Sequence, residues 1–110
     1  MELHGVIVYD ILNNDCLTGT WTNTDHQTIL TDNAKKFNGS TNDIVGDYVC
    51  SYIDIDRVVN SGNLTVTPVA GHPTYLFKWT FPNENNPPIR FSGIGFKFSK
   101  NKIAVSYRGH

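Results

Sequence analysis

Apolar and polar residues alternate along most of this chain with a period of two, the spacing of a β-strand with one buried face. The clearest case is residues 17–23, where Leu17, Gly19 and Trp21 share one face and threonines occupy the other. No long stretch has the spacing of an amphipathic helix. The pattern therefore predicts an all-β protein.

Turn-forming residues divide the alternating pattern into eight segments. We expect strands over residues 3–12, 16–23, 26–31, 44–59, 63–70, 74–81, 89–99 and 102–108. The segment 44–59 is long for a single strand, so we expect a bend in it at Gly46 or at residues 54–56.

The connections between these segments decide the architecture. We expect residues 32–43 to be irregular, with room for a helical turn at 33–37, residues 60–62 to form a hairpin turn and residues 82–88 a polar loop. Short turns between consecutive strands favour an antiparallel up-and-down order, and eight such strands can close into a barrel. A two-layer β-sandwich is the alternative, although it usually needs longer crossing connections.

Length and charge narrow the classes of protein to consider. A chain of 110 residues suffices for one core, so we expect residues 1–110 to form a single domain. The formal net charge is −1 and the basic residues are scattered, which gives no reason to expect a nucleic-acid partner. With neither a long apolar segment nor a signal-peptide pattern, we expect no membrane partner and a cytoplasmic location.

The interior of an eight-stranded barrel is just wide enough to be filled by side chains or to hold one small ligand. Glycines at positions 19, 93 and 95 favour sharp bending of the strands or close approach of a large group. The large aromatic residues expected on the inner face are the candidate ligand-binding residues: Trp21, Tyr48, Tyr52, Phe77, Trp79 and Phe91. We expect Trp79 and Phe77 to stack on a small apolar or aromatic ligand at the open end, with Trp21 closing the floor. A barrel filled by its own side chains remains the alternative.

The segment Leu-Thr-Gly-Thr-Trp-Thr-Asn at 17–23 resembles the first-strand motif of avidins, and its Gly-x-Trp core is similar to that of lipocalins. The resemblance implies a calycin-like barrel. We expect Leu17, Gly19, Trp21, Gly93 and Gly95 to shape its interior. Avidins surround their ligand with several tryptophans, whereas this chain has two, and it also has a strand before the motif. We therefore do not expect it to bind biotin.

The C-terminal half is similar to small uncharacterised bacterial β-proteins that end in a strand, a hairpin and a closing strand. The matching segments are residues 75–79, 91–95 and 103–107. This resemblance implies a fold and no particular activity. Both faces of these strands are apolar, and Ile94, Phe96 and Phe98 lie opposite the expected inner face. A solid barrel that packs this outer face on another protein or a second copy is therefore the alternative function.

Catalytic motifs are absent from the sequence: it has no nucleophile elbow, phosphate-binding loop or dinucleotide fingerprint. We therefore expect neither an enzyme nor a cofactor. A weaker alternative is acid–base chemistry by Asp54, Asp56 or a cavity tyrosine together with His26 or His72.

Metal and disulfide chemistry depend on side chains that are few in this chain. The four histidines, at positions 4, 26, 72 and 110, lack the spacing of a zinc site, so no metal is expected. Cys16 and Cys50 are expected to be reduced thiols. A disulfide stays open as an alternative if adjacent strands bring their backbones within about 7 Å.

Overall fold

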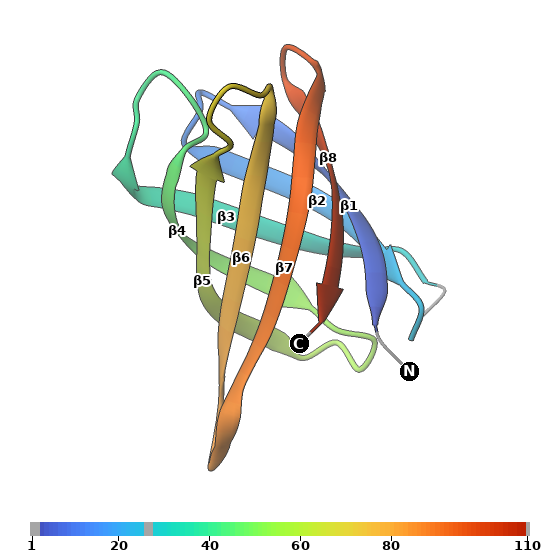
Figure 1. Cartoon of the computed structure of the whole chain (residues 1–110). Coiled ribbons are helices and arrows are strands. Elements are labelled where there is room, and N and C mark those ends of the chain that lie inside the picture. The colour runs from blue at the N-terminus through green and yellow to red at the C-terminus, as the bar shows by residue number, and fades with distance from the viewer. Residues whose placement is uncertain (1–2, 26–27, 110) are drawn as a thin grey trace.

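The computed structural model describes residues 3–25 and 28–109, and in it eight antiparallel strands follow one another around a closed barrel (Figure 1). The strands are β1 (His4–Leu12), β2 (Cys16–Asn23), β3 (Leu30–Gly39), β4 (Gly46–Ile53), β5 (Val59–Pro68), β6 (Thr74–Asn83), β7 (Asn86–Ser99) and β8 (Lys102–Gly109). Each strand pairs with its neighbours in sequence, and β1 also pairs with β8 to close the sheet. The prediction of an eight-stranded up-and-down barrel is confirmed, and the sandwich alternative is wrong.

Alternation along the strands places one apolar face inside the barrel. In β2, Leu17 and Trp21 are buried while Thr18 and Thr20 are exposed. The buried apolar side chains form one cluster: Ile7, Tyr9, Ile11, Leu17, Trp21, Ala34, Ile44, Tyr48, Cys50, Leu64, Val66, Phe77, Trp79, Phe81, Ile103, Val105 and Tyr107. Cys16 and Cys50 are free thiols.

Strand β3 lies where the sequence pattern predicted an irregular segment. It pairs with β2 and β4, so no helical turn forms at residues 33–37. Its inward positions include Asp32 and Ala34. An aspartate at an inward position hides the period-two signal, which is why the pattern predicted that the preceding strand ends at Thr31. Residues 26 and 27 of that predicted strand lie outside the described residues.

The turn between β4 and β5 is at residues 54–58, and the predicted turn at residues 60–62 is wrong. The Asp54 carboxylate accepts hydrogen bonds from the backbone N–H groups of Asp56 and Val58, both at 2.9 Å. Arg57 takes up a left-handed conformation with a φ of 63°. Aspartates commonly stabilise turns through such side-chain to backbone bonds. The Asp54-x-Asp56 pair is therefore part of a turn.

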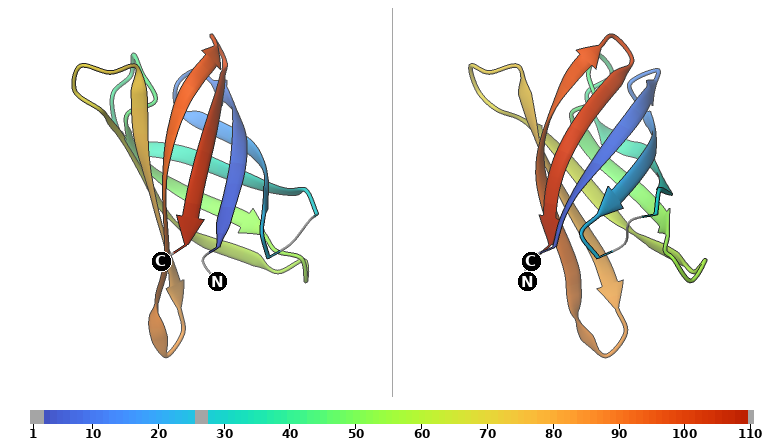
Figure 2. Two further views of the ribbon diagram at one scale, coloured as in Figure 1. Left: turned by 45° about the vertical axis from the view of Figure 1, so that its right-hand side comes forward. Right: turned by 90° about the vertical axis from the view of Figure 1, so that its right-hand side faces the viewer.

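The β6–β7 hairpin is longer than predicted. Its ladder continues to the pair Asn83 and Asn86, so most of the predicted loop at residues 82–88 belongs to strands. In Figure 2 this hairpin projects beyond the rest of the barrel, at the end where both termini lie.

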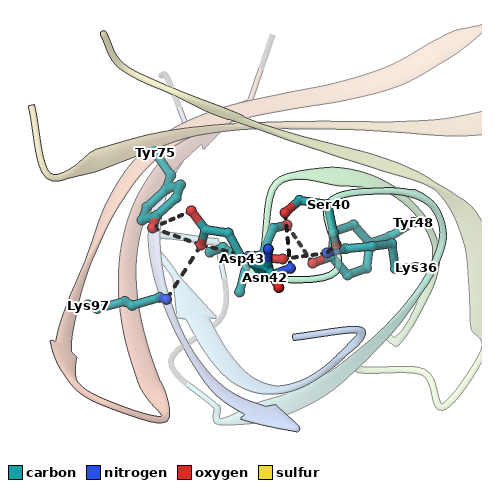
Figure 3. Close-up of polar contacts among 8 residues, drawn as sticks. Lys36, Ser40, Asn42, Asp43, Tyr48, Tyr75 and Lys97 are labelled. Carbon is teal, nitrogen blue, oxygen red and sulfur yellow. Dashed lines mark hydrogen bonds and ion pairs between the residues drawn. The ribbon is translucent and has the colours of Figure 1, made fainter. Parts of the chain in front are cut away.

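The connection at residues 40–45 covers part of the opposite end of the barrel. Ile44 on this segment is fully buried in the core, and the Tyr48 hydroxyl donates to its carbonyl oxygen at 2.6 Å. The Asp43 carboxylate accepts a hydrogen bond from Tyr75 at 2.9 Å and pairs with Lys97 at 3.5 Å (Figure 3). These contacts hold the segment in place across this end of the barrel.

Candidate functional site

A cavity of about 150 Å³, partly open to solvent, lies inside the barrel at the end where β1 begins and β8 ends. Its lining comprises Leu3, Ile7, Trp21, Asn23, Asp32, Tyr52, Asp54, Trp79, Phe81, Phe91 and Tyr107. Seven of these eleven residues, including Phe81 and Tyr107, were not among the predicted ligand-binding residues, because the register that brings them together is not visible from one strand at a time.

Four of the six candidate ligand-binding residues line this cavity: Trp21, Tyr52, Trp79 and Phe91. The other two lie elsewhere in the core. Tyr48 is fully buried next to the segment that carries Ile44. Phe77 is fully buried between Tyr9 and Trp79, with ring centroids 6.1 and 5.6 Å away. Of the two predicted stacking residues, only Trp79 therefore borders the cavity.

Six aromatic side chains that line the cavity contact one another in a continuous series, which we call the aromatic belt. Successive members pack edge to face, with ring centroids 4.8 to 6.1 Å apart. In order, the belt is Trp21, Tyr52, Phe81, Phe91, Tyr107 and Trp79. Edge-to-face packing is a favoured geometry for aromatic pairs and restricts their movement. All six residues belong to the cavity lining, so packed aromatic side chains form much of its wall.

One carboxyl group interrupts this apolar lining. Asp32 of β3 is only 4% exposed. Its Oδ2 atom accepts a hydrogen bond from the Tyr9 hydroxyl at 2.7 Å, and that hydroxyl accepts one from Trp79 Nε1 at 3.3 Å. The other carboxylate oxygen, Oδ1, is buried without a hydrogen-bond partner in the part of the chain that the structure describes. An unsatisfied buried acceptor is rare in native proteins and needs an explanation.

The surroundings of Asp32 disfavour its charged form. Burial raises the pKa of Asp32 to about 7. This effect outweighs the Tyr9 hydroxyl and the Asn33 backbone N–H, which both favour the charged carboxylate and lower the pKa. Burial, and then the nearby Asp32 charge, raise the pKa of the Tyr9 hydroxyl well above its ordinary value. Tyr9 therefore remains a neutral hydrogen-bond donor to Asp32 at physiological pH.

Gly19 of the Gly-x-Trp motif makes room for this polar pair. A Cβ atom at position 19 would lie 2.8 Å from two ring atoms of Tyr9 and 2.9 Å from Ile7. Cβ atoms at Gly93 and Gly95 would lie 2.6 and 2.8 Å from backbone oxygens of β8. The motif glycine thus serves the placement of Tyr9, whereas the two β7 glycines allow β8 to approach closely.

Of the described groups considered for catalysis, Asp54 and the tyrosines Tyr52 and Tyr107 line the cavity, whereas His72 does not. His72 lies in the β5–β6 connection, at the opposite end of β5 from Asp54 and Asp56. His26 and His110 lie outside the described residues. Over residues 3–25 and 28–109, no three His, Cys, Asp or Glu side chains are arranged to hold a metal ion.

Comparison with protein-family models, with curated proteins and with solved structures finds no match for this chain. Within the residues that the structure describes, no helix is long and apolar enough to cross a membrane. The geometry of the barrel and its cavity is the basis for any functional inference.

Proposed function

We propose that this barrel binds a small aromatic or apolar molecule in the cavity at its open end. The observation that carries the proposal is a cavity of about 150 Å³ lined by the six side chains of the aromatic belt. Small-molecule sites are typically preformed, mostly apolar hollows with a few polar groups that orient the ligand. Asp32 is such a group.

The size of the cavity limits the ligand. An engineered cavity of about 150 Å³ lined by apolar side chains accommodates benzene. A single aromatic ring, or an aliphatic group of the same volume, therefore fits between the belt residues, and a longer ligand would extend through the opening.

We expect a one-ring probe, benzyl alcohol, to bind the wild-type barrel and to bind Phe91→Ala roughly three- to tenfold more weakly, because one wall of the belt is lost. Phe91 is half-buried and contacts Phe81 and Tyr107 at 6.1 and 5.9 Å between ring centroids. Titrations followed by nuclear magnetic resonance of the cavity aromatic protons measure the dissociation constants.

Phe96→Ala is the matched control, because Phe96 lies on the same strand but on the outer face, where it is 53% exposed. Its affinity should equal that of the wild type. The absence of binding by benzyl alcohol and by a panel of other one-ring compounds would contradict the proposal. Equal weakening by both substitutions would contradict the assignment of the site to the cavity.

A second candidate function rests on the outer apolar patch, which we define as Val6, Val8, Leu76, Ile94, Phe96 and Phe98. These side chains are between 37% and 54% exposed. The strand registers place Leu76 beside Ile94 and connect Phe96 through Ala104 to Val8, so the patch spans β6, β7, β8 and β1. Exposed apolar areas that extend over several strands mark interaction sites. We propose that this patch packs on a second copy of the chain.

This second proposal predicts a solution mass twice the 12.3 kDa of one chain, measured by light scattering after size-exclusion chromatography. Phe96→Lys should return the mass to that of a monomer, because it puts a charge in the middle of the patch. Thr20→Lys places the same charge on the exposed outer face of β2 and should leave the dimer intact. A wild-type monomer at high concentration would contradict the proposal.

A further inference from the structure

The buried Oδ1 atom of Asp32 is the starting point of the inference. It is the buried side-chain polar atom without a hydrogen-bond partner in the described part of the chain, and Asp32 lies in the cavity lining. Its companion Oδ2 is held by Tyr9, so the carboxyl group has a defined orientation. A ligand that donates a hydrogen bond to Oδ1 would give both oxygen atoms of this carboxyl group a hydrogen-bond partner.

The charge of the lining points to a cation. Two carboxyl groups, of Asp32 and Asp54, belong to the lining, and among its described members there is no Lys, Arg or His. The Asp54 carboxylate is occupied by its own turn, where Oδ1 accepts from two backbone N–H groups and Oδ2 accepts from Asn60 at 3.2 Å. Of the two carboxyl groups, Asp32 is therefore the one with an oxygen atom that has no hydrogen-bond partner in the described part of the chain.

The aromatic belt favours the same kind of ligand. The faces of tryptophan, tyrosine and phenylalanine rings attract cations, and the attraction strengthens where water is excluded. A carboxylate beside several aromatic rings combines the two interactions that recognise organic ammonium groups. Neither interaction would favour an anionic ligand.

We propose that the cavity selects a small protonated organic amine, whose ammonium group donates a hydrogen bond to Oδ1 of Asp32 while its hydrocarbon part lies within the aromatic belt. This inference rests on the proposed function and specifies the class of ligand for the same cavity. The raised pKa of Asp32 agrees with it, because a buried carboxylate that lacks a nearby positive charge is costly to ionise and a bound cation supplies that charge.

The test compares three one-ring probes that differ in charge: benzylamine, benzyl alcohol and benzoate. At pH 8 we expect wild-type protein to bind benzylamine roughly 10- to 100-fold more tightly than benzyl alcohol, the range typical of a charge-assisted hydrogen bond. Benzoate should not bind measurably. Dissociation constants come from calorimetric and nuclear magnetic resonance titrations.

Asp32→Asn removes the charge with almost no change of shape, so this variant should bind benzylamine no more tightly than benzyl alcohol. Asp10→Asn is the matched control, because it changes the net charge equally on the outer face, where the Asp10 side chain is 65% exposed. This control should retain the full preference. The amide-region nuclear magnetic resonance spectrum of each variant establishes that the barrel is folded.

The outcomes separate this inference from the function on which it rests. If no probe binds, the proposed ligand site itself is wrong. If benzylamine and benzyl alcohol bind equally to the wild type, the site accepts aromatic rings without selecting cations and only the present inference is overturned. The inference is also overturned if Asp32→Asn keeps the preference, or if benzoate binds best, which would indicate a protonated Asp32 acting as donor.

Discussion

Replacing Trp21 by alanine is expected to lower the free energy of unfolding by about 3–5 kcal/mol, the usual cost of a large-to-small change in a core. Trp21 is 8% exposed and packs its ring against Tyr52, with centroids 5.6 Å apart. Its Nε1 atom donates a hydrogen bond to the Thr31 carbonyl oxygen at 3.2 Å, so the substitution also removes a link between β2 and β3. Since small domains are stable by about 5–15 kcal/mol, the variant should be close to unfolding.

Urea denaturation followed by far-ultraviolet circular dichroism measures this change. Phe37→Ala is the control, because it truncates an aromatic strand residue that is 64% exposed, and it should change the stability by no more than about 0.5 kcal/mol. A loss below about 1 kcal/mol for Trp21→Ala would mean that Trp21 does not support the core, contrary to its position in the barrel.

The second large effect is a loss of stability as the pH rises through the range in which Asp32 ionises. The pKa of this carboxyl is about 7 in the folded barrel and has its ordinary value of 3.8 in the unfolded chain. Between these values the folded state holds a proton that the unfolded state has released, so unfolding becomes easier with rising pH. The contribution of Asp32 is complete below about pH 4 and is lost as the pH approaches about 7. It amounts to about 4 kcal/mol at most.

The tyrosine and cysteine side chains around Asp32 do not ionise in this range. Burial raises the pKa of Cys50 and of Tyr107 to about 12 and also raises the pKa values of Tyr9 and Tyr52. The difference in stability between the wild type and Asp32→Asn therefore isolates the carboxyl group. Asparagine can still accept the hydrogen bond from Tyr9, so the variant should equal or exceed the wild type in stability above pH 7.

Urea titrations of both proteins at a series of pH values between 4 and 8 test this expectation. The stability difference should grow in favour of Asp32→Asn as the pH rises. A stability difference that stays constant over this range would show that Asp32 ionises normally. A difference that shifts in favour of the wild type as the pH rises would show that the charged form of Asp32 is stabilised in the fold. A gain in stability from neutralising a lining residue would also suit a site held ready for a ligand, since functional groups often reduce stability.

The sequence by itself determined the class of fold and the inner face of most strands. Leu17, Gly19 and Trp21 alternate with threonines without interruption, and short turns bound most of the segments, so period and connection length were enough to predict an antiparallel barrel. These signals are local, which is why they are visible in one chain. They failed where the local signal was reversed: Asp32 is a polar residue on an inward position, and Asp54 begins a turn within a stretch that alternates like a strand.

Tertiary structure alone decided which residues share the cavity. Trp21, Asp32, Tyr52 and Trp79 come from four strands, and the strand registers and barrel closure place them at one end. The same registers bring Tyr9 to Asp32 over 23 residues of sequence. Period-two alternation tells which face of a strand a side chain occupies but not its height in the barrel or its neighbours across the interior. Both depend on how all eight strands are staggered, a property of the closed sheet as a whole.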